Sequence, residues 1–157
     1  MSSAQESSVQ DRLDVTDLCT RVAWHTDLRE WDALYEVFAD KVLLDYTSLN
    51  GGEPFTATPR EIIEAWSQLL GGLASTQHLI SNFLVDVQGD EAVCTAMFQA
   101  VHRLPNGLGG PHWTLGGRYR WTALRTPAGW RVSAMVMTAL WSDGNRHIMT
   151  PEGQRTS

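Results

Sequence analysis

The stretch TQHLISNFLVDVQGDEAVCTAMFQAVHRL, residues 76–104, decides the fold of this chain. Its two halves, Thr76–Gln88 and Ala92–Leu104, are rich in residues that favour strands, and Gly89-Asp90 between them is typical of a tight turn. We therefore predict a long antiparallel hairpin, with side chains that alternate between its two faces.

The same pattern follows once more toward the C-terminus. Trp113–Arg125 and Trp130–Trp141 are also rich in strand-forming residues, and Thr126–Gly129 between them indicates a second turn. A loop over 105–111, rich in glycine and proline, separates the two hairpins. Four consecutive antiparallel strands predict one large sheet.

The N-terminal half is predicted to be largely helical. Apolar residues recur at helical spacing from Asp14 onward, which predicts a helix with one buried face. These residues are Val15, Leu18, Cys19, Val22 and Ala23. A short helix over 32–38, a strand over 41–47 and a turn-rich stretch over 48–52 follow, whereas residues 1–10 show no periodicity.

Thr58-Pro59-Arg60-Glu61 is the clearest local signal in the chain. Thr58 can cap a helix, Pro59 suits its first turn, and Glu61 stands where a capping box requires an acidic residue. Gly71-Gly72 marks the end of this helix.

Three helices followed by antiparallel strands indicate an α+β domain, with the helices on one face of a strongly curved sheet. We expect a single domain over residues 1–157, in which 1–10 and 143–157 are poorly defined tails. A length of 157 residues is sufficient for one hydrophobic core.

Composition narrows the class of protein. The chain carries 12 Lys and Arg against 18 Asp and Glu, a net charge of −6, and shows no basic stripe for nucleic acid. Its longest apolar stretch, 134–141, is too short to span a membrane, and residues 1–12 contain no apolar signal segment. We expect a cytoplasmic protein whose two cysteines, Cys19 and Cys94, are buried thiols.

Seven tryptophans are many for a chain of this length. They could fill an ordinary core, or they could line a pocket for a flat or hydrophobic ligand. Composition alone does not separate these two interpretations.

Strand alternation directs several polar side chains toward the predicted interior. His78 shares a face with Ile80 and Asn82, and His102 ends a row of small and apolar residues. On the first helix, Asp27 continues the apolar stripe at a spacing of four residues. A helix on the concave face of the sheet would bring this carboxylate near both histidines.

These residue types suit proton transfer beside a carbonyl group. An imidazole abstracts a proton, a carboxylate such as Asp27 orients it, and a tyrosine such as Tyr46 donates to a developing oxyanion. Structural alternatives exist for each residue. Asp27 could pair with Arg29 or be solvated, His78 could be a core histidine, His102 could be half-exposed, and Tyr46 could merely pack at the rim.

Other chemistries lack a motif. The five histidines form no HxH, HExxH or Cys/His cluster, so no metal site is predicted. No GxSxG elbow, Walker loop or GxGxxG is present, which disfavours serine hydrolases, nucleotide hydrolases and Rossmann enzymes.

Several short segments, in this order, resemble the nuclear-transport-factor-2-like superfamily in its SnoaL-like and scytalone-dehydratase-like branch. They are DLREWDAL (27–34), VFAD (37–40), LDY (44–46), TQHLISN (76–82), GDEA (89–92), GRY (117–119) and GWRV (129–132). The resemblance covers residues 12–141. It implies a cone-shaped sheet around an interior pocket.

The resemblance also implies roles for individual residues. Dehydratases of this branch eliminate water from a hydroxy ketone without a metal or an organic cofactor. Asp27 matches the carboxylate of the first helix, His78 the histidine it orients, His102 a second pocket histidine, and Tyr46 a tyrosine that polarises the substrate carbonyl through water. Asn82 is a further candidate, whose amide would hold the leaving hydroxyl.

One departure from the family pattern is Thr26, which stands where the family has a second tyrosine. Carbonyl activation would then rest on Tyr46 alone. Further side chains are expected to contact the substrate. They are Trp24, Trp66, Asn82, Phe98, Trp113, Tyr119 and Met137.

The leading hypothesis is a cofactor-independent dehydratase or isomerase acting on a hydrophobic, cyclic hydroxy-carbonyl compound of polyketide or steroid type. His78 would be the base, and His102 would protonate or bind the leaving hydroxyl. A cyclase that closes a ring by aldol addition or epoxide opening could use the same groups. A non-catalytic ligand-binding or partner-docking module would not need them. We also expect a homo-oligomer, dimer or trimer, with Trp121 and Trp130 in its interface.

Overall fold

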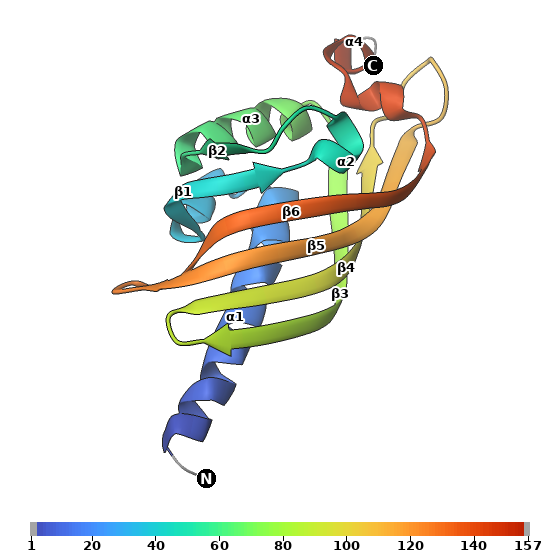
Figure 1. The fold of residues 1–157 in the computed structure, drawn as a ribbon. Helices are drawn as coiled ribbons and strands as arrows, with labels where there is room; N and C mark the ends of the chain where they lie inside the picture. The colour runs from blue at the N-terminus through green and yellow to red at the C-terminus, as the bar shows by residue number, and fades with distance from the viewer. Residues whose placement is uncertain (1–2, 156–157) are drawn as a thin grey trace.

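The computed structural model describes residues 3–155 and has the predicted α+β fold, with helices against a curled sheet that does not close (Figure 1). The helical elements are α1 (Ser3–Leu28), the 3₁₀ helix η1 (Trp31–Glu36), α2 (Thr47–Asn50), α3 (Pro59–Gly71), the 3₁₀ helix η2 (Arg146–Met149) and α4 (Pro151–Arg155). The strands are β1 (Phe38–Asp45), β2 (Phe55–Ala57), β3 (Ser75–Gln88), β4 (Glu91–Arg103), β5 (His112–Thr126) and β6 (Gly129–Gly144).

The six strands lie in the order β2-β1-β6-β5-β4-β3. The two long hairpins, β3–β4 and β5–β6, confirm the prediction from the sequence. The pairing of β1 with β6 is parallel, unlike the other pairings of the sheet. The stretch expected to be rich in turns holds α2, and the short β2 after it adds an unforeseen edge strand.

The concave face of the sheet carries the core. Every inward side chain of β4 from Ala92 to His102 is buried, as strand alternation predicts. α1 crosses this face against β3 and β4, and α3 packs beside it against β1 (Figure 1). Cys19 and Cys94, on α1 and β4, are both free and buried, which confirms the expected thiols.

Helix α3 begins as its sequence requires. The Thr58 hydroxyl accepts from the backbone N–H of Glu61, and the Glu61 carboxylate accepts from the backbone N–H of Thr58. This reciprocal pair is the predicted capping box.

Both ends of the chain differ from the expectation of undefined tails. α1 begins at Ser3 and not at Asp14. Its first turns extend beyond the sheet (Figure 1), so no covered face imposed an apolar stripe on that segment. At the other end, residues 146–155 form η2 and α4, and Ile148 is only 1% exposed. Residues 1–2 and 156–157 of the expected tails lie outside the described residues.

The expectation that Trp121 and Trp130 form an interface is wrong, because they are 1% and 5% exposed within this chain. The same alternation that turns Tyr119 inward also turns Trp121 inward, and Trp130 packs near the start of α1. The outer face exposes other apolar side chains. They include Leu79, Leu84, Met97, Leu140 and Trp141.

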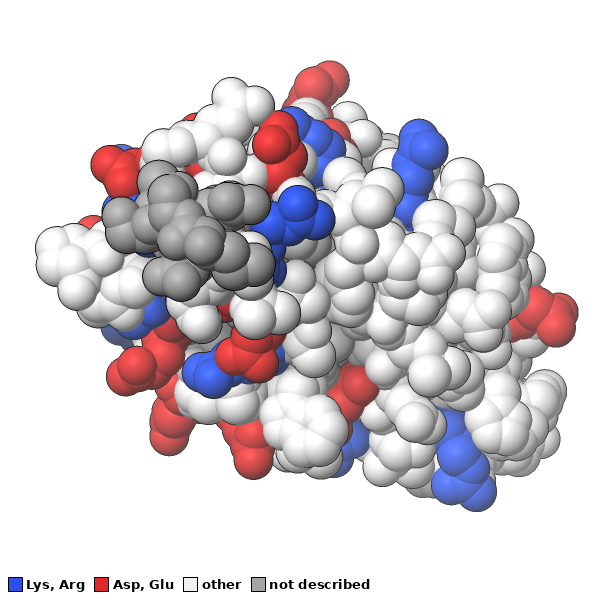
Figure 2. Space-filling view, turned by 90° about the horizontal axis from the view of Figure 1, so that it is seen from below, with Lys and Arg blue, Asp and Glu red and all other residues white. Residues whose placement is uncertain are grey.

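Charged side chains of both signs are interspersed over the face seen in Figure 2, and part of that face is nearly free of charge. Within residues 3–155, no helix combines the length and the hydropathy that crossing a membrane would require.

A partly buried ion pair joins α1 to the β5–β6 hairpin. The Arg125 guanidinium donates to both carboxylate oxygens of Asp11, at 2.7 and 2.8 Å, and lies 4.4 Å from the centre of the Trp130 ring. Trp130 Nε1 donates to the same carboxylate at 3.2 Å. Such two-point pairs are among the stronger polar contacts in proteins.

We predict that this contact stabilises the fold only while Asp11 is ionised. Hydrogen bonds from Arg125 and Trp130 hold the pKa of Asp11 below its usual 3.8, against the opposing effect of burial. The stabilisation is therefore present above pH 3.8 and is lost as the pH falls through the lower pKa of the folded chain. Arg125→Ala should lower the free energy of unfolding at neutral pH, measured by urea denaturation, because it leaves the Asp11 carboxylate without its partner.

The control is Arg120→Ala, which removes an exposed arginine of the same strand. Its free energy of unfolding should stay within about 0.5 kcal/mol of the wild type. Equal losses in the two variants, or an Arg125→Ala effect that persists in strong acid, would contradict the assignment.

Candidate active site

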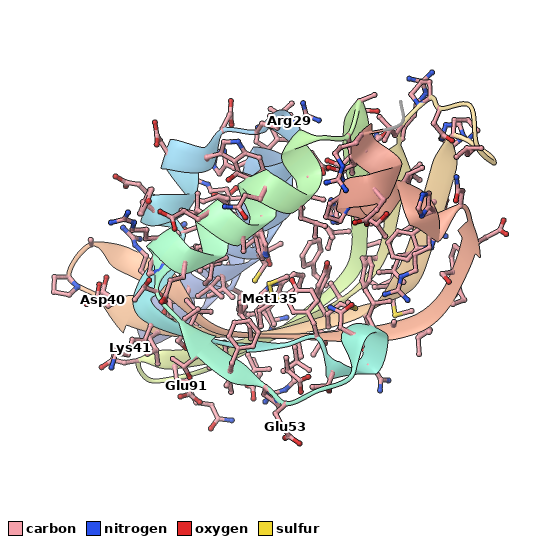
Figure 3. All side chains as sticks on the ribbon, turned by 90° about the horizontal axis from the view of Figure 1, so that it is seen from above. Arg29, Asp40, Lys41, Glu53, Glu91 and Met135 are labelled. Carbon is pink, nitrogen blue, oxygen red and sulfur yellow. The ribbon has the colours of Figure 1, made fainter. Side chains whose placement is uncertain are left out.

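A cavity of about 500 Å³ lies between α1, α3 and the concave face of the sheet. This volume is within the range of small-molecule sites. Its wall is mainly apolar and aromatic, and Figure 3 shows one lining residue, Met135, in the interior beneath α3. The polar or charged residues on the wall are Thr26, Tyr46, Asn50, His78, His102, Tyr119, Arg146, His147 and Thr150.

His78 of β3 is bound at two points by Asp27, near the end of α1. Its Nδ1 lies 2.7 Å from Asp27 Oδ1, and its backbone N–H donates to Asp27 Oδ2 at 2.6 Å. The two side chains are 13% and 16% exposed. Because a carboxylate accepts and does not donate, Nδ1 carries a proton, and in the neutral form of the ring the lone pair therefore lies on Nε2.

A sharp turn holds Asp27 in this position. α1 ends at Leu28, and Arg29 adopts a left-handed conformation with φ of 58°. The Arg29 guanidinium then donates to the carbonyls of Leu70 and Leu73, where α3 ends (Figure 3). One residue thus reverses the chain after Asp27 and ties the ends of the two helices together.

His102 of β4 is held in a different way. Its Nδ1 donates to the carbonyl of Trp113, its partner across the β4–β5 ladder, at 3.1 Å. Burial away from water lowers the His102 pKa from 6.5 to about 4, so the ring is neutral near pH 7. The His78 and His102 ring centres are 6.3 Å apart, with the planes nearly perpendicular.

Two tyrosines line the cavity beyond the histidines. The Tyr46 hydroxyl contacts the sulfur of Met135 at 3.7 Å, and the Tyr119 ring stacks on Phe98 with centres 4.3 Å apart. Burial raises the pKa of both phenols well above the usual 10, and the Asp27 charge raises that of Tyr119 further. Both hydroxyls are therefore protonated and able to donate.

The cavity opens beside α2 and η2, where its lining residues Asn50, Arg146 and His147 are exposed. Arg146 donates to the carbonyl of Leu49 and to the Asn50 side chain, and its guanidinium lies 5.5 Å from the centre of the Trp113 ring. The C-terminal segment is thus part of the wall of the cavity.

A family model described as the SnoaL-like domain matches residues 7–136. The chain belongs to the SnoaL-like domain family. An uncharacterized protein of Mycobacterium tuberculosis is 31% identical over 136 residues, which cover 84% of this chain and 87% of that protein.

Several solved structures resemble this chain along most of its length. The Kfla4162 protein of Kribbella flavida is 31% identical with a TM-score of 0.86, covering 90% of this chain and 98% of that one. A candidate aromatic ring hydroxylase of Novosphingobium aromaticivorans is 25% identical with a TM-score of 0.77 and the same coverage. A candidate scytalone dehydratase of that organism, 18% identical with a TM-score of 0.74 over 90% and 92% of the two chains, shares the fold. The likenesses confirm the fold of the nuclear-transport-factor-2-like superfamily.

The structure brings most of the residues expected at the site to this cavity. Those on its wall are Tyr46, Trp66, His78, Phe98, His102, Trp113, Tyr119 and Met137. Asp27 lies behind His78 and reaches the cavity through that imidazole.

Two expected contact residues lie elsewhere. Trp24 is 60% exposed, because Val22, Ala23 and Thr26 occupy the side of α1 that faces the cavity. Asn82 is also exposed, because a bulge between Ser81 and Leu84 interrupts the β3–β4 ladder. Its φ of 59° marks the point where the alternation that includes His78 is lost.

Other residues that were not predicted from the sequence also line the cavity of the SnoaL-like domain. Trp121 follows Tyr119 by two residues on the same strand, so alternation could have placed it inside. Met135 and Arg146 had no comparable signal, since their positions depend on the pairing of β6 and on the fold of the C-terminal segment. In the range 3–155, no group of three His, Cys, Asp or Glu side chains is arranged to bind a metal ion.

We predict that His102 titrates near pH 4 and not near pH 6.5. The unfolded chain then binds more protons than the folded chain between these values, so the free energy of unfolding falls as the pH decreases through this window. NMR titration of the imidazole resonances measures the pKa, and urea denaturation across the window measures the stability. His102→Gln should remove this contribution, whereas His25→Gln, a change at a histidine outside the cavity, should keep it. Titration of His102 near its ordinary value would contradict the prediction.

Proposed function

We propose that this SnoaL-like domain is a lyase that eliminates water from a hydrophobic, cyclic hydroxy ketone. The observation that carries the proposal is the Asp27–His78 pair, in which a carboxylate orients an imidazole on the wall of an apolar cavity. The family supports this reading, and one neighbour in fold is named as a candidate scytalone dehydratase.

His78 would act as the base. Its Nδ1 proton is engaged by Asp27, so Nε2 has the lone pair that takes a proton from the carbon beside the substrate carbonyl. The ring becomes an imidazolium at that moment, and the adjacent carboxylate stabilises its charge. Because these two side chains are mostly buried, this stabilisation is stronger than in bulk solvent.

Tyr46 and Tyr119 would stabilise the enolate. Each phenol keeps its proton, because burial raises its pKa, and can donate to the carbonyl oxygen as that oxygen gains negative charge. Tyr119 thus takes the place of the tyrosine that the sequence lacks at Thr26. The Thr26 hydroxyl itself donates to the carbonyl of Val22 in its own helix.

His102 would bind the leaving hydroxyl and not protonate it. Its proton is held by the Trp113 carbonyl, so its Nε2 accepts the substrate O–H. The proton that His78 has taken from carbon then passes from Nε2 to the hydroxyl oxygen as the C–O bond breaks. Water leaves, the C=C bond forms, and His78 returns to its neutral state.

We predict that the protein converts 3-hydroxy-1-tetralone to 1-naphthol with the loss of one water. His78→Ala should lower kcat by roughly 100- to 10,000-fold, the usual contribution of a positioned base. The absorbance of 1-naphthol measures turnover, and mass spectrometry identifies the product. The matched control is His25→Ala, because His25 pairs with Glu30 outside the cavity.

The outcomes separate the alternatives. A His78→Ala variant with full activity would refute the role of this imidazole. A product of unchanged mass would identify an isomerase or a cyclase that uses the same groups. Ligand binding without any turnover, unaffected by replacing His78 and Asp27, would identify a binding module.

We also predict that Asp27→Asn lowers kcat by about 100- to 10,000-fold with little change in KM. The amide of asparagine can donate to Nδ1 of His78, which favours the tautomer with its proton on Nε2 and removes the free lone pair from the cavity. ¹⁵N NMR of the imidazole reports the tautomer directly. Asp45→Asn is the control, because its carboxylate accepts from Thr47 and does not line the cavity. An unchanged His78 tautomer with full activity would contradict the prediction.

A further inference from the structure

The opening of the cavity carries a positive charge that no carboxylate balances. Among the side chains of residues 9–155, no Asp or Glu lines the cavity, although the chain has 18 of them against 12 Lys and Arg. The Asp27 carboxylate lies behind His78 and is engaged by that residue at two points. Of the lining residues in this range, Arg146 alone is charged at every pH at which the protein would work.

Arg146 is held in place by neutral groups. Its Nη2 donates to the carbonyl of Leu49 at 3.4 Å and to Oδ1 of Asn50 at 3.3 Å, and its guanidinium lies 5.5 Å from the centre of the Trp113 ring. Its Nε and Nη1 have no acceptor between residues 9 and 155, where Arg146 also forms no ion pair. Because Arg146 is exposed and lines the cavity, a ligand at the opening can reach its guanidinium.

Two aromatic rings lie between Arg146 and the proposed base. The Trp113 ring centre is 5.1 Å from that of His102, and the His102 ring centre is 6.3 Å from that of His78. All of these residues line the cavity. A ligand with its reacting carbon at His78 can therefore bring a substituent on the other end of its ring system to Arg146.

An anionic substituent is favoured at the opening and disfavoured deeper in the cavity. The wall farther inside is mainly apolar, so a charge there would lose its water without gaining an opposite charge. At the opening the anion keeps part of its hydration and meets a guanidinium, which is a strong donor to oxyanions. One guanidinium balances the single charge of a carboxylate, whereas a phosphate monoester carries close to two charges.

We propose that Arg146 binds a carboxylate of the substrate at the opening of the cavity. The substrate is then a carboxylated cyclic compound, bound with its carboxylate toward solvent and its reacting carbon toward His78. The ligand's identity as a substrate rests on the proposed function, whereas anion binding by Arg146 does not.

The first test measures affinity by equilibrium dialysis with two ligands of the same shape. They are 2-naphthoate and 2-naphthamide, which differ in charge. Arg146→Gln should lower the preference for the carboxylate over the amide about fivefold relative to the wild type, which is the upper range for an exposed ion pair.

The matched control is Arg118→Gln, which removes the same charge from an exposed arginine of β5 that does not line the cavity. This variant should keep the preference of the wild type. A preference that Arg146→Gln leaves unchanged, or that both variants lower equally, would overturn the proposal.

The second test is an NMR titration of the wild type, which stands on its own if Arg146→Gln does not fold. The side-chain Nε–H resonance of Arg146 is assigned by its absence in Arg146→Lys, at a mildly acidic pH that slows exchange with water. Naphthoate should move this resonance downfield, and naphthamide should not. Equal shifts with both ligands, or none with either, would contradict binding of the carboxylate by Arg146.

Failure of this inference can be told apart from failure of the proposed function. In His78→Ala the preference for naphthoate should persist, since binding at the opening needs no base. A wild type whose Arg146 resonance ignores naphthoate, but which loses turnover with His78→Ala, would overturn the carboxylate site alone.

Discussion

The Asp27 carboxylate accepts two hydrogen bonds from one residue of the sheet, from the backbone and from the imidazole of His78. This double contact fixes where α1 ends relative to β3, and Arg29 must reverse the chain immediately afterward. Neither group is exposed enough to exchange its partner for water at little cost. The contact between Asp27 and His78 therefore fixes the position of α1 on the concave face and orients His78 toward the cavity.

Burial acts in opposite senses on the other titratable groups of the cavity, and in each case it yields a neutral side chain. It lowers the pKa of His102, which favours the unprotonated ring, and raises the pKa of Tyr46 and Tyr119, which favours the protonated phenols. The interior thus offers nitrogen lone pairs near the opening and hydroxyl donors deeper inside. Arg146 adds a positive charge only at the rim.

The parts of the fold that depend on local rules could be predicted from the sequence. The two hairpins follow from strand composition and turns, and α3 follows from the capping box at Thr58. Asn82 could not be placed, because a bulge is set by the pairing of two strands and not by the residue alone. The start of α1 could not be predicted either, because a helix that extends past the sheet needs no apolar stripe.

The candidate site, like the fold, could be predicted in part. His78 and His102 occupy regular strand positions, where the period of two determines the face. The C-terminal wall was not predictable, because Arg146 is held at the cavity by contacts with residues distant in sequence, among them Leu49 and Asn50 of α2.

Both histidines stand on a single wall, since β3 and β4 are neighbours in the sheet. If a flat substrate lies against that wall, only one of its two faces contacts His78. Of the two hydrogens of a CH₂ group beside the carbonyl, only the one on that face would then be within reach of His78. The curl of the sheet would in this way impose a stereochemical course, and exchange in heavy water would label one prochiral position and spare the other.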